Sequence, residues 1–390
     1  MKYEDTVKLL TSSEKFRISP GLERMENVLE LLKNPQEKLK YIHVAGTNGK
    51  GSVCAILASV LKEAGKKVGL YTSPHIFKYT ERIQICGKNI SDEDFTKYVF
   101  EISEIADKNN IDLTEFEIIT ATMFKYFADN NAEIVILETG MGGRLDATNV
   151  IKQNMCSIIT HIDYDHTERL GKTLDEIAAE KAGIIKANCP CITFEGKEAY
   201  YDRAMEVNAP LNLIVPYADT SELALKGTYQ EENLALALAA IELCFPEIPK
   251  TIINKGLQNV KHPCRFQYIK DKNLIIDGAH NPNGIKSLIR SLEQHYPYEK
   301  RRFIFGCLNN KDYKTMINSL FSEKDEIYFY HFSHKNSATY NELQEVCSYK
   351  ATELKSKDQI DFNDGKLNII CGSFYMISEL TQLLDIDIFK

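Results

Sequence analysis

Residues 41–65 read YIHVAGTNGKGSVCAILASVLKEAG, and the rest of the chain is best interpreted outward from this stretch. An apolar strand, Tyr41–Ala45, runs into a Gly-rich turn and then into a helix predicted over Gly51–Ala64. The glycines let the backbone wrap around phosphate oxygens, and the helix N-terminus adds partial positive charge. Lys50 would reach the β- and γ-phosphates of ATP, and Ser52 would offer its hydroxyl to magnesium. The stretch therefore predicts a nucleotide-binding loop.

The spacing within this loop departs from the common phosphate-loop pattern. Two residues separate Gly46 from Gly49, and Gly51 stands between Lys50 and Ser52. The common pattern has four residues between the glycines, and Ser or Thr directly follows Lys. A Gly-rich turn without a ligand is the alternative interpretation. The lysine, the serine and the strand–loop–helix context together favour nucleotide binding.

Short apolar strands alternate with amphipathic helices on both sides of the loop. Such alternation predicts an α/β fold in which a parallel sheet carries helices on both faces. The predicted strands are Tyr41–Ala45, Lys67–Tyr71, Glu133–Glu138, Cys156–His161 and Cys191–Phe194. The predicted helices are Gly51–Ala64, Asp92–Asn109, Glu115–Asn130, Thr173–Ile185 and an Ala/Leu-rich helix within Gly227–Phe245.

A second alternation begins near Leu274 and predicts a smaller, Rossmann-like α/β domain. The aperiodic segment Asn259–Cys264 (NVKHPC) contains a proline, so the junction is expected there. The predicted domains are residues 1–262 and 263–390. The second domain's predicted strands are Leu274–Asp277, Arg302–Gly306, Glu326–Tyr330 and Leu367–Cys371, and its predicted helices are Asn283–His295, Tyr313–Phe321, Asn341–Tyr349 and Ser373–Leu384.

Bulk properties narrow the class of protein. A length of 390 residues suggests two domains at roughly 150 residues each. The net charge of −8 argues against nonspecific nucleic-acid binding, which depends on basic patches. No basic and apolar leader opens the chain, and no apolar run approaches the roughly 20 residues that span a bilayer. The ten cysteines form no C-x-x-C pair, which is typical of free thiols in a reducing cytoplasm.

Three polar motifs follow predicted strands: TSPH (72–75), ETGMGGRLDATN (138–149) and DYDHT (163–167). Ligands of open parallel sheets gather at the carboxyl ends of the strands, so these motifs are expected beside the phosphate loop. Magnesium prefers hard oxygen ligands and usually keeps water molecules. Glu138, at the end of a very apolar strand, is a candidate ligand. His166 alone would be an ordinary structural histidine, but Asp163 and Asp165 in the same loop favour a functional role.

Together these motifs resemble the folylpolyglutamate synthase family of the Mur ligase superfamily, whose members in many bacteria also act as dihydrofolate synthases. The resemblance covers almost the whole chain in order. Besides the motifs above, it includes GLERM (21–25), YTERI (79–83), EKAGI (180–184), CRFQ (264–267), DGAHNP (277–282) and GSFYMISE (372–379).

The resemblance implies a role for particular residues. Gly49, Lys50, Gly51 and Ser52 would bind ATP phosphates, and Asn233, Arg265 and Asp277 would bind the nucleotide. Two magnesium ions would be held by Ser73, Glu138 and His166. The pterin substrate would contact the segment near Pro20–Leu22, together with Thr114, Leu145, Asp146 and Ala147.

Lys181 of EKAGI matches a lysine that is carbamylated in the family. A carbamate is an anion and could orient a magnesium ion or its water. By its position on a predicted helix alone, Lys181 would be an ordinary surface lysine.

The resemblance also implies the reaction. ATP would phosphorylate a folate carboxylate, and the amine of L-glutamate would attack the resulting acyl phosphate. Tetrahydrofolate is the expected acceptor, and dihydropteroate is a further candidate. Lys50, Lys181 and His166 would be the catalytic residues of a monomeric enzyme. The family's C-terminal domain often carries Arg where Lys335 stands, and Asp where Asn310 stands, so this chain departs from the family pattern at positions expected to contact the amino acid.

Three other classes of protein remain as alternatives. One is a Mur-type ligase that acts on cell-wall precursors, against which YTERI and GGRLDATN argue. Another is a phosphate-loop NTPase that drives a conformational change in a partner, although a second α/β domain follows here. The third is a module that binds nucleotide without chemistry, which the combination of Lys50, Glu138 and His166 disfavours.

Overall fold

The computed structural model describes residues 2–12, 15, 17 and 19–389. The chain forms two compact units, Met1–Leu223 with Glu231–Val260, and Ala224–Gln230 with Lys261–Lys390. The domain boundary predicted from the sequence places the segment Ala224–Gln230 in the first domain. Its contacts lie with the second unit, because the Thr228 amide donates to Ser291 Oγ and the Tyr229 hydroxyl donates to Asp277.

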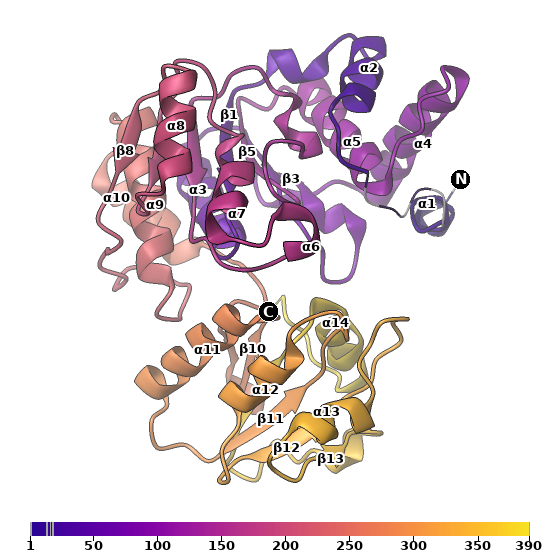
Figure 1. Cartoon of the computed structure of the whole chain (residues 1–390), viewed down its shortest axis with the longest axis vertical. Helices are drawn as coiled ribbons and strands as arrows, with labels where there is room; N and C mark the ends of the chain where they lie inside the picture. The colour runs from indigo at the N-terminus through magenta and orange to yellow at the C-terminus, as the bar shows by residue number, and fades with distance from the viewer. Residues whose placement is uncertain (1, 13–14, 16, 18, 390) are drawn as a thin grey trace. The chain divides into compact units, whose positions relative to one another are not determined.

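The first unit is built on an eight-stranded sheet with the order β4-β3-β2-β5-β1-β6-β7-β8 (Figure 1). Six strands are parallel, as predicted for the phosphate-loop domain, and the hairpin β3–β4 runs antiparallel beside β2. The predictions missed the hairpin and β8, which are only two or three residues long and mostly not buried. The strands are β1 (Tyr41–Ala45), β2 (Val68–Tyr71), β3 (Ile83–Ile85), β4 (Lys88–Asn89), β5 (Ile134–Glu138), β6 (Cys156–Ile159), β7 (Cys191–Thr193) and β8 (Leu211–Leu213).

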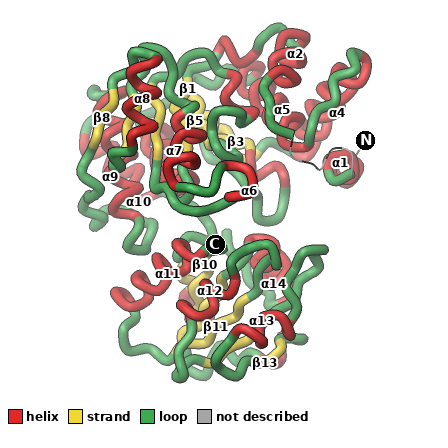
Figure 2. The backbone as a smooth tube through the Cα atoms, viewed as in Figure 1, coloured by secondary structure: helices red, strands yellow, loops and turns green. Residues whose placement is uncertain are grey.

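Helices surround the strands of this sheet (Figure 2), and apolar side chains between helices and strands form a buried core. Phe95, Phe124 and Phe127, from two of these helices, join one fully buried cluster with strand residues such as Leu137. The described helices are α1 (Tyr3–Leu10), α2 (Glu23–Leu31), α3 (Lys50–Glu63), α4 (Asp92–Lys108), α5 (Glu115–Asp129), α6 (Thr167–Leu170), α7 (Leu174–Ala182), α8 (Glu198–Glu206), α9 (Gln230–Cys244) and α10 (Lys250–Asn259), with short 3₁₀ turns η1 (Pro35–Lys38), η2 (Tyr79–Arg82) and η3 (Ala147–Val150).

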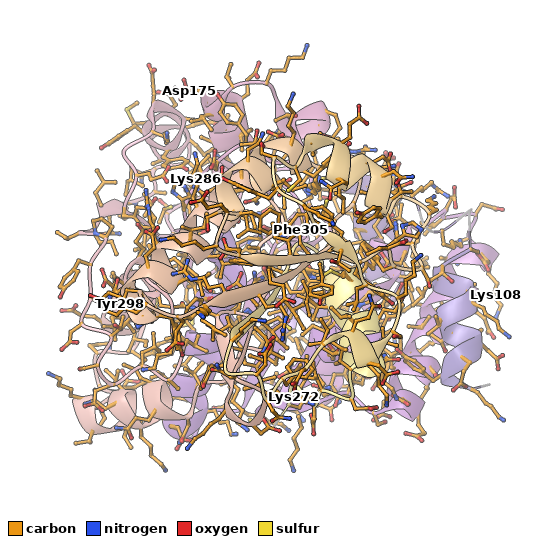
Figure 3. All side chains as sticks on the ribbon, turned by 90° about the horizontal axis from the view of Figure 1, so that it is seen from below. Lys108, Asp175, Lys272, Lys286, Tyr298 and Phe305 are labelled. Atoms are coloured by element: carbon orange, nitrogen blue, oxygen red, sulfur yellow. The ribbon has the colours of Figure 1, made fainter. Side chains whose placement is uncertain are left out.

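The second unit holds a six-stranded sheet with the order β13-β12-β11-β14-β10-β9, parallel except for β9. Phe303, Phe305 and Phe329 fill its core, and Phe305 lies in the middle of this unit, whereas Tyr298 lies at its rim (Figure 3). The elements are β9 (Gln267–Ile269), β10 (Leu274–Asp277), β11 (Arg301–Phe305), β12 (Glu326–Phe329), β13 (Thr352–Glu353), β14 (Leu367–Cys371), α11 (Pro282–His295), α12 (Tyr313–Leu320), α13 (Tyr340–Val346), α14 (Phe374–Leu383), η4 (Lys270–Lys272) and η5 (Lys357–Gln359).

Two further observations bear on the class of protein. All ten cysteines are free thiols. None of the described helices combines the length and the apolar character that a bilayer crossing requires.

Candidate functional site

The loop predicted to bind phosphate, Gly46–Ser52, connects β1 to the start of α3 and is called the phosphate loop below. The Lys50 side chain folds back across it. The Lys50 Nζ donates to the carbonyl oxygens of Gly46 at 3.0 Å and Thr47 at 3.2 Å. The segment that follows β6 anchors this loop. The Thr47 amide donates to the His161 carbonyl, and Thr160 Oγ1 donates to the Asn48 carbonyl. The strand, turn and helix predicted from this stretch are therefore present, with the lysine charge positioned over the turn.

Asn233 of α9 packs directly against this loop. Gly49 adopts φ +93°, in the left-handed region, and a Cβ added there would lie 2.3 Å from Asn233 Oδ1. Only glycine combines that backbone conformation with so close an approach. The structure thus brings Asn233, which is 184 positions further along the chain, to the loop, as its predicted role in nucleotide binding requires.

Replacing Gly49 with alanine should therefore weaken nucleotide binding. The added methyl group must displace the Asn233 side chain, in addition to the cost of a positive φ, and overpacking of this kind costs about 1–3 kcal/mol. We expect the Kd for ADP, measured by calorimetry, to rise by about tenfold or more.

The matched control is Gly65→Ala, because Gly65 has a similar φ of +79° but no atom within 4 Å of an added Cβ. Equal effects of the two substitutions on ADP affinity would refute the packing role of Asn233.

The candidate metal ligands lie at the carboxyl ends of strands around the loop. Glu138 ends β5 and is 3% exposed, and its Oε2 accepts a hydrogen bond of 2.9 Å from the Ser73 amide. Asp163 lies against the phosphate loop, because its backbone amide donates to Thr47 Oγ1 and its carbonyl oxygen accepts from the same hydroxyl. His166 precedes α6 with φ +50°, and its ring lies near Asp165 and Glu168.

Among the described residues, no three His, Cys, Asp or Glu side chains form a group that could hold a metal ion. Magnesium bound to ATP takes only one or two carboxylates from the protein and fills its other positions with phosphate oxygens and water. The hard oxygen donors of Glu138 and Ser73, adjacent to each other at the strand ends, fit that kind of site.

Lys181 is not a surface lysine, although its position on a helix suggested one. Its side chain comes from α7, is 3% exposed, and donates from Nζ to the Gly46 carbonyl at 2.8 Å. Lys50 donates to the same carbonyl. Burial and the nearby Lys50 charge lower the pKa of Lys181 to about 7, against the opposing charges of Asp165 and Asp146. A buried lysine therefore stands beside the phosphate loop with much of its amine neutral near pH 7.

The predicted pterin-contacting residues lie at the start of α5 and at the start of η3. Thr114 caps α5 reciprocally with Glu117, whose carboxylate also pairs with Arg24 at 2.8 Å. Asp146 accepts from the amides of Gly140, Met141 and Thr148, so its carboxylate is occupied in shaping the loop that carries Leu145 and Ala147. Contact of these residues with a substrate stays a prediction.

Asp277 and Arg265 belong to the second unit. Asp277 ends β10, and its carboxylate accepts from Tyr229 Oη and from the Phe266 and Ala279 amides. Burial raises the pKa of Asp277, and the charge of Arg265 works against that rise. The Arg265 guanidinium lies 4.9 Å from the centre of the Phe374 ring. The role of Asp277 and Arg265 in nucleotide binding remains a prediction.

The two positions that depart from the family pattern also lie in this unit, on neighbouring loops. The Asn309 amide donates to the Asn336 carbonyl at 2.8 Å, which joins the loop of Asn310 to that of Lys335. Contacts of these residues with the amino acid are likewise predictions.

One polar cluster was not assigned a role from the sequence. Arg82 Nε donates to His75 Nδ1 at 2.9 Å, and Arg82 Nη1 lies 3.6 Å from Glu115 Oε1. The His75 ring packs on Tyr79 with centroids 4.3 Å apart. Burial, together with the Arg82 charge, lowers the pKa of His75 to about 3. The signal in the sequence was the co-occurrence of TSPH and YTERI, which gave a resemblance but no contact between the two motifs.

Comparison with known proteins agrees with this architecture. Residues 44–191 match the Mur ligase middle domain, and residues 264–364 match the Mur ligase glutamate ligase domain. The dihydrofolate synthase/folylpolyglutamate synthase of Bacillus subtilis is 34% identical, over 98% of this chain and 99% of the relative. The enzyme of the same name from Escherichia coli is 30% identical, over 94% of this chain and 92% of its own.

Solved structures give the same assignment. The bifunctional folylpolyglutamate synthase/dihydrofolate synthase of Yersinia pestis superposes with a TM-score of 0.89 at 30% identity, covering 99% of both chains. A structure of a bifunctional enzyme with Mn, AMPPNP and L-glutamate bound has a TM-score of 0.88 at 30% identity, covering 99% of this chain and 98% of that one. With both domain matches in order along the chain and a 34% identical relative that covers nearly all of it, this protein belongs to the dihydrofolate synthase/folylpolyglutamate synthase family of Mur ligases.

Proposed function

We propose that this chain is an ATP- and magnesium-dependent ligase that adds L-glutamate to the carboxylate of a folate, with tetrahydrofolate as acceptor. The observation that carries the proposal is the convergence of Lys50 and Lys181 on the Gly46 carbonyl of the phosphate loop. Relatives that match this chain over nearly their whole length are named as dihydrofolate synthase/folylpolyglutamate synthase, and one solved relative was complexed with Mn, AMPPNP and L-glutamate.

The chemistry follows in two balanced steps. An acceptor carboxylate oxygen attacks the γ-phosphorus of ATP, the bond from that phosphorus to the β,γ-bridging oxygen breaks, and ADP leaves. The glutamate amine then attacks the carbonyl carbon of the acyl phosphate, the carbon–oxygen bond to phosphate breaks, and the amine loses a proton. Lys50 would stabilise charge that develops on the transferred phosphoryl group. Magnesium held by Ser73, Glu138 and His166 would neutralise phosphate charge.

Each domain then has a proposed part. Residues 1–262 would bind ATP and the folate, with Gly49, Gly51, Ser52 and Asn233 at the nucleotide. Residues 263–390 would contribute Arg265 and Asp277. We take the working form to be a cytoplasmic monomer; ten free thiols suit a reducing compartment, and size-exclusion chromatography tests the oligomeric state.

Product analysis tests the function directly. Purified protein is incubated with ATP, magnesium and L-glutamate, and with tetrahydrofolate or dihydropteroate as separate acceptors. We expect one ADP released per glutamate joined to tetrahydrofolate, detected by mass spectrometry. The dihydropteroate reaction decides whether the chain is bifunctional. ADP release without an amide product, or amide formation only with a muramyl acceptor and its amino acid, would refute the proposal.

A further inference from the structure

We propose, on the basis of the ligase activity proposed above, that His75 donates a hydrogen bond from Nε2 to the reacting carboxyl group of the acceptor, and that Arg82 and Glu115 hold its ring in place. His75 would thus be a substrate-positioning contact.

The tautomer of His75 follows from its partner. Arg82 Nε is a donor and can accept nothing, so His75 Nδ1 must present its lone pair to it. The proton of a neutral ring then resides on Nε2. In the part of the chain that the structure describes, no group hydrogen-bonds to Nε2, and this atom is not among the enclosed polar atoms. The ring therefore offers one donor that the protein itself does not use.

Two neighbours hold the His75 ring, and a third group, Glu115, holds one of those neighbours. Arg82 is hydrogen-bonded to the ring, and the Tyr79 ring lies against it at a tilt of 51°, with the ring centroids 4.3 Å apart. The Arg82 and Glu115 side chains are each 11% exposed, and their opposite charges lie 3.6 Å apart. Glu115 Oε1 has no hydrogen-bond partner in the described residues, so the pair is held by charge and not by a second hydrogen bond. A ring fixed in this way can orient a ligand without losing rotamer freedom on binding.

The cluster is linked to the residues proposed to bind magnesium on one side and to the start of α5 on the other. Ser73, two residues before His75, is hydrogen-bonded through its amide to Glu138 at the end of β5. Strand β5 pairs with β1, which leads into the phosphate loop. On the other side, Glu115 and Phe116 form the first turn of α5, and an added Cβ on Gly140 would lie 2.4 Å from the Phe116 ring. His75 is thus positioned between the candidate metal ligands and the helix end expected to contact the pterin.

A neutral donor suits the first chemical step. The carboxylate must attack the γ-phosphorus, so an oxygen has to keep its nucleophilicity while it is oriented. A cation paired with that carboxylate would stabilise its charge in the ground state more than in the transition state, where the charge moves toward phosphorus. Glu115 offsets the charge of Arg82, and the His75 ring, which accepts from Arg82 at Nδ1, presents its Nε2–H on the other side, so the carboxylate is oriented by a dipole.

Two conservative substitutions separate this role from a structural one. In His75→Asn the amide lies near the position of Nδ1 and can still accept from Arg82, but nothing reaches the position of Nε2. In His75→Gln the amide reaches the position of Nε2 and can still donate to the acceptor. Steady-state kinetics of the wild-type enzyme come first, because glutamate ligation to tetrahydrofolate tests the proposed function independently of His75.

With wild-type ligation established, we expect His75→Asn to lower kcat/KM for tetrahydrofolate by about tenfold or more, since a hydrogen bond to a charged group is lost. His75→Gln should stay within about threefold of wild type. KM for ATP should stay within about twofold for both variants, and Lys78→Ala, an exposed change in the same segment, should match wild type. The reverse order of Asn and Gln, equal losses, or losses that follow Tm or KM for ATP would overturn the assignment.

Discussion

Replacement of Lys50 by alanine is expected to lower kcat for ligation by about a hundredfold or more while leaving the fold intact. Removing one preorganised charge or donor from a transition state typically costs about 10²–10³ in kcat. Lys50 Nζ lies over the loop, within 3.2 Å of the Gly46 and Thr47 carbonyl oxygens. In the part of the chain that the structure describes, the hydrogen bonds from Lys50 Nζ go to loop carbonyl oxygens, so stability should change little when the side chain is removed.

Lys62→Ala is the matched control, because Lys62 is an exposed lysine of the same helix α3. Stopped reactions analysed for glutamylated product give kcat, and thermal unfolding of both variants gives Tm. Normal turnover of Lys50→Ala with unchanged ATP affinity would refute the phosphate-loop assignment. Parallel loss of Tm and activity would show that Lys50 acts on the fold.

Replacement of Lys181 is expected to have an effect of similar size. Carbamylation requires a neutral amine, whose lone pair forms a bond to the carbon of CO₂ while one proton is released to solvent. A pKa of about 7 supplies that neutral amine near physiological pH. We therefore propose that Lys181 carries a carbamate, whose negative charge would be stabilised by Lys50 and by magnesium.

Intact-protein mass spectrometry tests the modification. In bicarbonate at pH 8 the wild-type protein should carry the added mass of one CO₂, which should disappear on acidification and in Lys181→Ala. Lys181→Ala should lose about a hundredfold or more of kcat, and a short carboxylic acid in solution should restore part of it. An unmodified Lys181 in the wild-type protein, together with normal turnover of Lys181→Ala, would refute the proposed carbamate. Lys172→Ala, on an exposed residue just before α7, is the control.

The lowered pKa of Lys181 also predicts how stability depends on pH in CO₂-free buffer. The unfolded chain binds a proton at Lys181 up to about pH 10.5, whereas the folded chain releases it above about pH 7. Because the unfolded state binds more protons in this window, the free energy of unfolding contributed by this residue rises between pH 7 and pH 10.5. As pH falls through 7 that contribution is lost. Denaturant unfolding should show this pH dependence in wild type and a smaller one in Lys181→Met.

Local patterns in the sequence were sufficient for much of the fold. The strand β1, the loop and helix α3 are encoded within 25 consecutive residues, because apolar strand, glycines and helix formers each act locally. Reciprocal caps define where helices begin, as Thr114 with Glu117 does for α5 and Thr173 with Glu176 does for α7. The apolar strand that ends at Glu138 likewise predicted where a candidate metal ligand would stand.

The environment of each site residue could not be obtained in that way. Lys181 lies on a helix whose local sequence EKAGI gives no sign of burial, and its partner is a carbonyl 135 positions away. Asn233 reaches Gly49 because α9 packs beside the loop, and His75 owes its tautomer to Arg82, which comes from a separate turn. Periodicity tells which face of an element is apolar, but not which element it will meet. Desolvation and neighbouring charges depend on which elements pack together. The lowered pKa of Lys181 and the unused Nε2–H donor of His75 therefore arise only in the folded chain.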